Sequence, residues 1–155
     1  KHMKIKLAIV AILALVVTSC GGDKKKVEYP VKSKTEIATP AKKVDPMTDK
    51  GIGPVTSITL GELDQAMVTE GEQIFKAKCS ACHKIRKRFI GPGMKGITER
   101  RTPEWIMNMI LNPEEMVQKN QIAMDLLKEY NAPMANQSLT EDEARKILEY
   151  FRTKN

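Results

Sequence analysis

The chain has 155 residues, with 26 lysines and arginines against 19 aspartates and glutamates, three cysteines and two histidines. A chain of this length holds one domain with an appendage. Its positive charge is modest and is not gathered into a dense basic patch interleaved with aromatic residues, so the composition gives little support to a nucleic-acid-binding protein.

The N-terminus predicts a secretory signal of the lipoprotein type. Lys4 and Lys6 form a positively charged start, and the apolar run over residues 7–17 is too short for a membrane-spanning helix. The run ends in the letters VTSC, which resemble the lipobox of bacterial lipoproteins, where the signal is cut before the cysteine and the cysteine is lipidated. We therefore expect residues 1–19 to be removed and Cys20 to anchor the protein on the periplasmic side of a bacterial membrane. An uncleaved signal anchor is the alternative.

Residues 20–57 predict a flexible, disordered linker behind the lipidated cysteine. Lysine, threonine, proline and glycine dominate this segment, and no apolar periodicity runs through it. Such a segment cannot bury enough apolar surface to offset the entropy lost on ordering. The folded domain is therefore expected to occupy residues 58–155, with order beginning near Ile58.

The sequence signals for the first two predicted helices differ in strength. Residues 61–78 carry apolar side chains mostly at helical spacing, but Gly71 interrupts them at a cost of about 1 kcal/mol relative to alanine. That glycine makes sense if another helix packs closely against it. A second helix follows Thr102, which can cap it, with Pro103 in its first turn.

Three more helices complete the predicted domain. Asn112 and Pro113 end the preceding helix and introduce a short one over residues 114–118, and apolar spacing predicts another over residues 121–130. The last helix begins at Thr140, because Glu143 three residues later completes a capping box. No strong alternating strand pattern occurs, so the expected fold class is all-α.

The segment CSACH, residues 79–83, carries the chemistry. A structural zinc site needs four ligands, and apart from the lipidated cysteine only Cys79, Cys82 and the adjacent His83 are present. A thioredoxin-like dithiol is expected beside strands, and a disulfide closing so short a loop stabilises little. Cys-x-x-Cys-His is, however, the attachment signature of c-type haem, in which two thiols bind the vinyl groups and the histidine ligates the iron. One covalently bound haem c is therefore predicted.

With this motif in place, about residues 60–153 resemble the class I c-type cytochromes. An N-terminal helix leads into the motif, and IGPGMKGI at residues 90–97 resembles the Gly-Pro-x-Leu segment of that family, with Met94 at the leucine position. The resemblance implies a fold in which helices wrap around one haem. It also implies that the carbonyl of Pro92 accepts a hydrogen bond from His83.

The same resemblance implies how the first and last helices meet. In the family these helices cross at a glycine and an aromatic residue. Gly71 and Phe75 would then meet Ile147 and Tyr150.

The second axial ligand is expected to be a methionine. Bis-histidine ligation is excluded in the mature chain, because His2 is removed with the signal and His83 is then the remaining histidine. In the family the ligand lies in a loop shortly before the last helix, which points to Met134, with Met124 as the next choice. A thioether ligand favours ferrous iron and raises the potential. The methionines after the motif are Met94, Met107, Met109, Met116, Met124 and Met134.

A basic cluster follows the haem motif, with Glu99 as its one acidic residue. It is either a solvated face or a docking surface for an acidic redox partner, and some of its members could instead meet the haem propionates. Trp105 could line the haem pocket or pack in the core. The cluster comprises Lys84, Arg86, Lys87, Arg88, Lys95, Arg100 and Arg101.

These observations predict a monohaem electron carrier rather than an enzyme. Residues 100–116 and 132–152 resemble the small cytochromes c that accompany nitrous-oxide reductase. That resemblance implies single-electron transfer from a quinol-oxidising membrane complex to a copper-containing terminal reductase or oxidase in the periplasm. Dihaem peroxidases need a second Cys-x-x-Cys-His, which is missing. A haem-based gas or redox sensor, or a cytochrome subunit of a larger oxidoreductase, remains an alternative.

Overall fold

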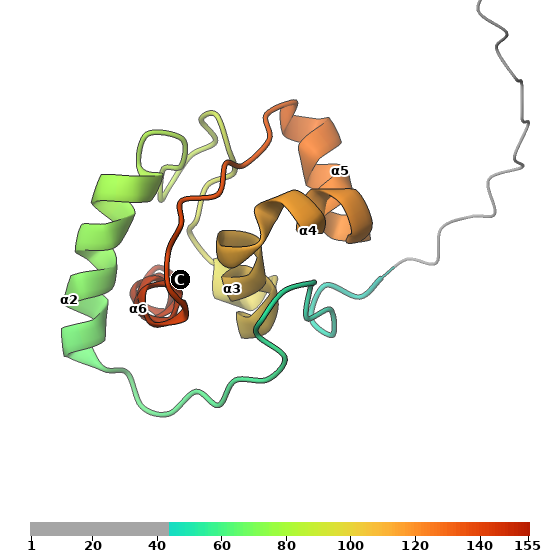
Figure 1. Ribbon diagram of the computed structural model, residues 1–155. Coiled ribbons are helices and arrows are strands. Elements are labelled where there is room, and N and C mark those ends of the chain that lie inside the picture. The colour runs from blue at the N-terminus through green and yellow to red at the C-terminus, as the bar shows by residue number, and fades with distance from the viewer. Residues whose placement is uncertain (1–43) are drawn as a thin grey trace, which may run out of the picture. The chain divides into compact units, whose positions relative to one another are not determined.

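The computed structural model describes residues 44–155, so the predicted signal peptide, Cys20 and the linker up to residue 43 lie outside the described residues. The described part is helical and contains no strand, as predicted. None of its helices is long and apolar enough to cross a membrane. In chain order the elements are α2 (Gln65–Ile74), the π-helix η1 (Phe75–Cys79), the 3-10 turn η2 (Ile97–Glu99), α3 (Pro103–Leu111), α4 (Pro113–Lys119), α5 (Gln121–Tyr130) and α6 (Glu141–Arg152) (Figure 1).

Local capping signals set where the helices begin. The carboxylate of Asp64 accepts the backbone N–H groups of Ala66 and Met67 at 2.8 and 3.1 Å, so α2 starts at residue 65 rather than 61. Thr102 caps α3 as predicted, and the predicted capping box of Thr140 and Glu143 is present at α6. The predicted helices are therefore confirmed, with small shifts at their ends.

Helices α2 and α6 cross at Gly71. A Cβ atom at this position would collide with the backbone carbonyl of Lys146, so only a glycine permits this approach. One turn further on, the ring of Phe75 lies 5.5 Å from that of Tyr150 and 5.6 Å from that of Phe151. Figure 1 shows α6, seen almost end-on, between α2 and α3. The predicted crossing of the first and last helices is confirmed.

The predicted start of order at Ile58 is wrong, because the preceding segment packs against α3 and α4. We call residues 45–57 the strap; it runs below these two helices in Figure 1. The side chain of Asn108, which is 1% exposed, donates to the carbonyls of Lys50 and Val55 at 2.9 and 2.8 Å. Its Oδ1 accepts the N–H of Val55 at 3.0 Å. A segment with little apolar surface of its own is thus ordered by polar side chains on the helices.

Removing the Asn108 side chain is expected to release the strap. Asn108→Ala would leave one N–H and two carbonyl groups without partners beside the buried Val55, so we expect a loss of about 2–4 kcal/mol in the free energy of unfolding. Denaturant unfolding of the haem-loaded protein measures this loss. Gln118→Ala, on the exposed face of α4, is the matched control and should change stability little. Equal midpoints for the two variants would contradict the strap's contribution.

Candidate functional site

The two thiols and the imidazole of the CSACH segment lie on one face of a helical turn. η1 ends at Cys79, and the chain continues without unwinding, because the N–H groups of Cys82 and His83 both reach the carbonyl of Cys79 at 3.1 and 2.9 Å. Residues three and four positions apart share a helix face. The turn therefore presents both sulfur atoms and the imidazole toward the same side.

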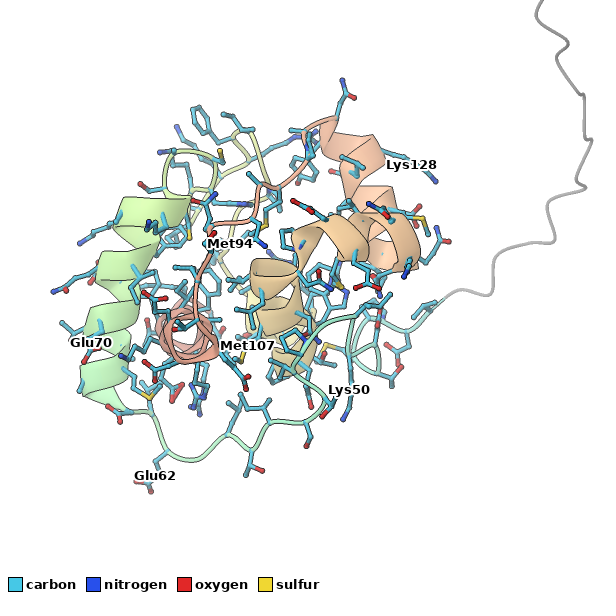
Figure 2. The ribbon with its side chains drawn as sticks, viewed as in Figure 1. Lys50, Glu62, Glu70, Met94, Met107 and Lys128 are labelled. Atoms are coloured by element: carbon cyan, nitrogen blue, oxygen red, sulfur yellow. The ribbon has the colours of Figure 1, made fainter. Side chains whose placement is uncertain are left out.

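That side is an apolar cavity of about 240 Å³ in the middle of the domain. Its walls come from η1, the loop of residues 84–96, α3, α5, the segment of residues 131–140 and α6. Figure 2 shows Met94, from the first of these loops, directed into the interior. Large apolar side chains dominate the walls, among them Ile90, Ile97, Ile106, Leu126, Ile147 and Phe151.

His83 is held in one orientation by the loop behind it. Its Nδ1 lies 3.0 Å from the carbonyl oxygen of Pro92, which can only accept, so Nδ1 is the donor and Nε2 is the nitrogen left to act as a ligand. Gly91 closes the loop by donating its N–H to the carbonyl of Cys82 at 3.0 Å. A Cβ atom on Gly91 would collide with the imidazole. This requirement for a glycine was missed from the sequence, although the pair Gly91-Pro92 was its signal.

Three methionines line the cavity: Met94, Met109 and Met134. Met124, the second choice as ligand, is not among the lining residues. Met109, on α3, is a second thioether at the site that the sequence analysis did not single out as a candidate. Met116 is buried elsewhere, where its sulfur accepts the N–H of Ile52 from the strap at 3.0 Å.

The cavity wall also holds an unpaired polar group. The Nε of Arg101 is buried and has no hydrogen-bond partner within residues 44–155. Burial and the neighbouring Arg100 lower the pKa of Arg101, while the carboxylate of Asp49 opposes that shift. A half-buried guanidinium whose buried Nε–H lacks a partner in the described part of the chain suits a carboxylate such as a haem propionate. Thiols, imidazole, thioethers, apolar walls and this donor together fit a haem.

Trp105 both lines the cavity and packs in the core, the two roles that its sequence position left open. Its ring lines the cavity and is buried, and the guanidinium of Arg101 lies 5.2 Å from the ring centroid. Its indole N–H donates to Oδ1 of Asn120 at 3.2 Å. The same Oδ1 caps α5 by accepting the N–H of Ala123 at 3.0 Å, so Trp105 links the cavity wall to the start of α5.

The protonation of Cys79 argues against a redox dithiol. Burial, with Cys82 beside it, raises the pKa of the Cys79 thiol to about 11. Catalytic dithiols work through a thiolate whose pKa is lowered instead. Within residues 44–155 no three side chains of His, Cys, Asp or Glu are grouped so as to hold a metal ion.

The basic cluster after the motif is partly structural. Lys84 donates to the carbonyl of Ser80 at 2.6 Å, and Arg100 donates to the carbonyls of Lys95 and Gly93 at 2.5 and 2.6 Å. These contacts hold the loop that carries Pro92. Whether the other members of the cluster form a solvated face or a docking surface stays a prediction.

Comparison with known proteins agrees with this geometry. The cytochrome c family model matches residues 68–154. A cytochrome c from Rhodothermus marinus is 45% identical, with a TM-score of 0.64 over 65% of this chain and 88% of that one. An engineered form, Rma TDE, is 44% identical with a TM-score of 0.63 over 65% and 89%, and the same form bound to a carbene intermediate is 45% identical with a TM-score of 0.61 over 65% and 88%.

No curated protein matches the chain. The family model and the solved structures are enough to assign the family. The matched segment contains the CSACH turn, the cavity walls and the crossing of α2 with α6. The chain therefore belongs to the cytochrome c family, whose members transfer electrons through a covalently attached haem c.

Proposed function

We propose that this chain is a membrane-tethered monohaem cytochrome that carries single electrons between membrane respiratory complexes and a periplasmic terminal reductase or oxidase. The observation that best supports this proposal is that the oriented imidazole of His83 and the thioether of Met134 line the same apolar cavity, beside the turn that holds both thiols. We assign Cys79 and Cys82 to covalent attachment, His83 and Met134 to the axial positions, and Pro92 to orienting the imidazole.

These residues suit electron transfer better than chemistry on a bound substrate. The haem iron supplies a one-electron redox couple. With His83 and Met134 as its two ligands and the apolar walls around it, the haem iron would have no open coordination site. The thioether of Met134 is expected to raise the reduction potential, and the carbonyl of Pro92 would hold the imidazole in one orientation.

The tether and the partners extend this proposal. A lipid on Cys20 would hold the domain on the periplasmic side of a bacterial membrane, within reach of a quinol-oxidising complex as donor. A copper-containing enzyme, such as nitrous-oxide reductase, would be the acceptor. The resemblance of residues 100–116 and 132–152 to the cytochromes that accompany that reductase supports this choice.

A haem-based gas or redox sensor is the second candidate, because Met134 lies in a segment without regular secondary structure. A methionine in such a segment can leave the iron more easily than one on a helix. A cytochrome subunit of a larger oxidoreductase would differ from a free carrier by stable co-purification with its partner.

Met134→Ala tests the ligand assignment and the function together. We expect the wild-type haem to be low-spin and not to react with carbon monoxide, and the variant to lose the methionine-to-iron band, to bind carbon monoxide and to have a lower reduction potential. Optical spectra of the ferric and ferrous protein, with and without carbon monoxide, measure this. Met109→Ala is the matched control from the same cavity and should keep the band. A wild type that binds carbon monoxide readily would favour the sensor.

A further inference from the structure

Helix α5 forms one wall of the cavity, and little of the protein packs against its opposite side. The helix it packs against is α4, and Figure 1 shows it at the edge of the molecule. Ala123, Leu126, Leu127 and Tyr130 face the cavity. The chain then leads directly into the segment that holds Met134. The position of α5 therefore decides where that methionine lies.

Polar contacts fix α5 at its two ends. At its start, Asn120 caps the helix through Oδ1 and donates through Nδ2 to the carboxylate of Asp49 in the strap at 2.7 Å. At its end, Asn131 adopts the left-handed conformation with φ 49° and closes the last turn. The end is the part next to Met134, and a different contact secures it.

That contact is made by Arg88, five residues after His83. One guanidinium nitrogen lies 3.0 Å from Oε1 of Glu129, and the other donates to the backbone carbonyl of Glu129 at 2.8 Å. The guanidinium also lies over the ring of Tyr130, 4.0 Å from its centroid. Carbonyls in the last turn of a helix lack partners within it, and a cation is favoured there by the helix dipole. We call these three contacts the Arg88 clasp.

The Arg88 clasp joins two walls of the cavity that are distant in sequence. Ile90 and Gly91 of the His83 loop line the cavity on one side, and Tyr130, Ala132 and Pro133 line it on the other. The clasp links these segments directly. It therefore connects the side that carries the imidazole to the side that carries the thioether.

We propose that Arg88 is a positioning residue for haem ligation: it holds the end of α5 against the His83 loop and thereby keeps Met134 on the iron. This inference rests on the proposed role of Met134. When the clasp is broken, the segment after α5 moves away more often, and an external ligand displaces the methionine more easily. Because the ion pair with Glu129 is exposed, its loss should change the affinity for an external ligand only moderately. We expect the affinity for external imidazole to rise about three- to tenfold.

The chain offers matched variants for the test. Arg88→Gln removes the clasp, and Arg88→Lys keeps the charge but not the planar fork that contacts both oxygens and the ring. Arg86→Gln removes the same charge from the same loop, where Arg86 is exposed and forms no ion pair within residues 44–155. Glu129→Gln weakens the clasp from the exposed partner side and serves if an Arg88 variant fails to take up haem.

The measurement is a titration of the ferric, haem-loaded proteins with imidazole, followed by the loss of the methionine-to-iron band. We expect tighter imidazole binding in Arg88→Gln, an intermediate value in Arg88→Lys, a smaller change in the same direction in Glu129→Gln, and the wild-type value in Arg86→Gln. Equal affinities in Arg88→Gln and Arg86→Gln would overturn the proposal. If Met134→Ala keeps the band, the ligand assignment fails as well. If it loses the band while Arg88→Gln binds imidazole like wild type, only the role of Arg88 fails.

Discussion

Gly71→Ala is expected to lower the free energy of unfolding by about 3 kcal/mol, although alanine is the better helix former by about 1 kcal/mol. The added methyl group would collide with the carbonyl oxygen of Lys146, which belongs to the backbone of α6 and cannot rotate away as a side chain would. The helices would have to separate. Because α2 leads through η1 into Cys79, the separation would also move the haem attachment turn. Denaturant unfolding of the haem-loaded protein measures the loss.

Gly61→Ala is the control for this substitution. A Cβ atom at Gly61 meets no atom within 4 Å, so alanine should be neutral or slightly stabilising there. If Gly71→Ala unfolds at the same denaturant concentration as Gly61→Ala, the crossing of α2 and α6 is looser than the structure indicates. A shift in the ferric spectrum of Gly71→Ala alone would show that the strain reaches the haem.

The features predicted correctly from the sequence are mainly those that depend on residues close together in the chain. The caps at Thr102 and Thr140 act within one turn of the chain, so their residues are neighbours in the sequence. Gly71 could be interpreted although its partner helix is distant in sequence. A glycine inside a helix is unfavourable unless another element approaches it closely. The CSACH turn was equally local, because its function depends on spacings of three and four residues.

The strap could not be predicted in this way. Its order depends on side chains that lie 53 to 64 positions further along the chain, on Asn108, Asn112 and Met116. Nothing in the strap's own composition reveals these partners. The available signal was a row of polar residues at helical spacing, Glu104, Asn108 and Asn112, in which the buried amide of Asn108 needs backbone groups as partners.

The methionines show a similar limit. Helical periodicity identifies the apolar stripe of α3, but it does not distinguish a side chain facing other helices from one facing a cofactor. Met107 and Met109 lie in the same helix, and of these two Met109 lines the cavity. The partner of Arg88 was equally hidden, since Glu129 lies 41 residues away.

The fold itself is expected to depend on haem attachment. Cys79→Ala combined with Cys82→Ala would remove both points of attachment, and we expect the variant to lose the covalent haem and much of its helical structure. Side chains from η1, α3, α5 and α6 line the cavity. Without the haem their apolar surfaces would face water, at a cost of about 25 cal/mol for each Å² exposed. A domain this small has little other core with which to offset that cost.

Haem staining after denaturing electrophoresis measures the attachment, and far-ultraviolet circular dichroism measures the helix content. Ser80→Ala is the matched control, because Ser80 lies between the two cysteines and its hydroxyl donates to the carbonyl of Lys76, within the same helical turn, at 2.6 Å. It should keep both signals. A double variant that lacks haem but retains full helicity and cooperative unfolding would mean that the crossing of α2 with α6 and the strap on α3 and α4 suffice for the fold. The loss of helix should be greatest in α5, because this helix lines the cavity and packs mainly against α4.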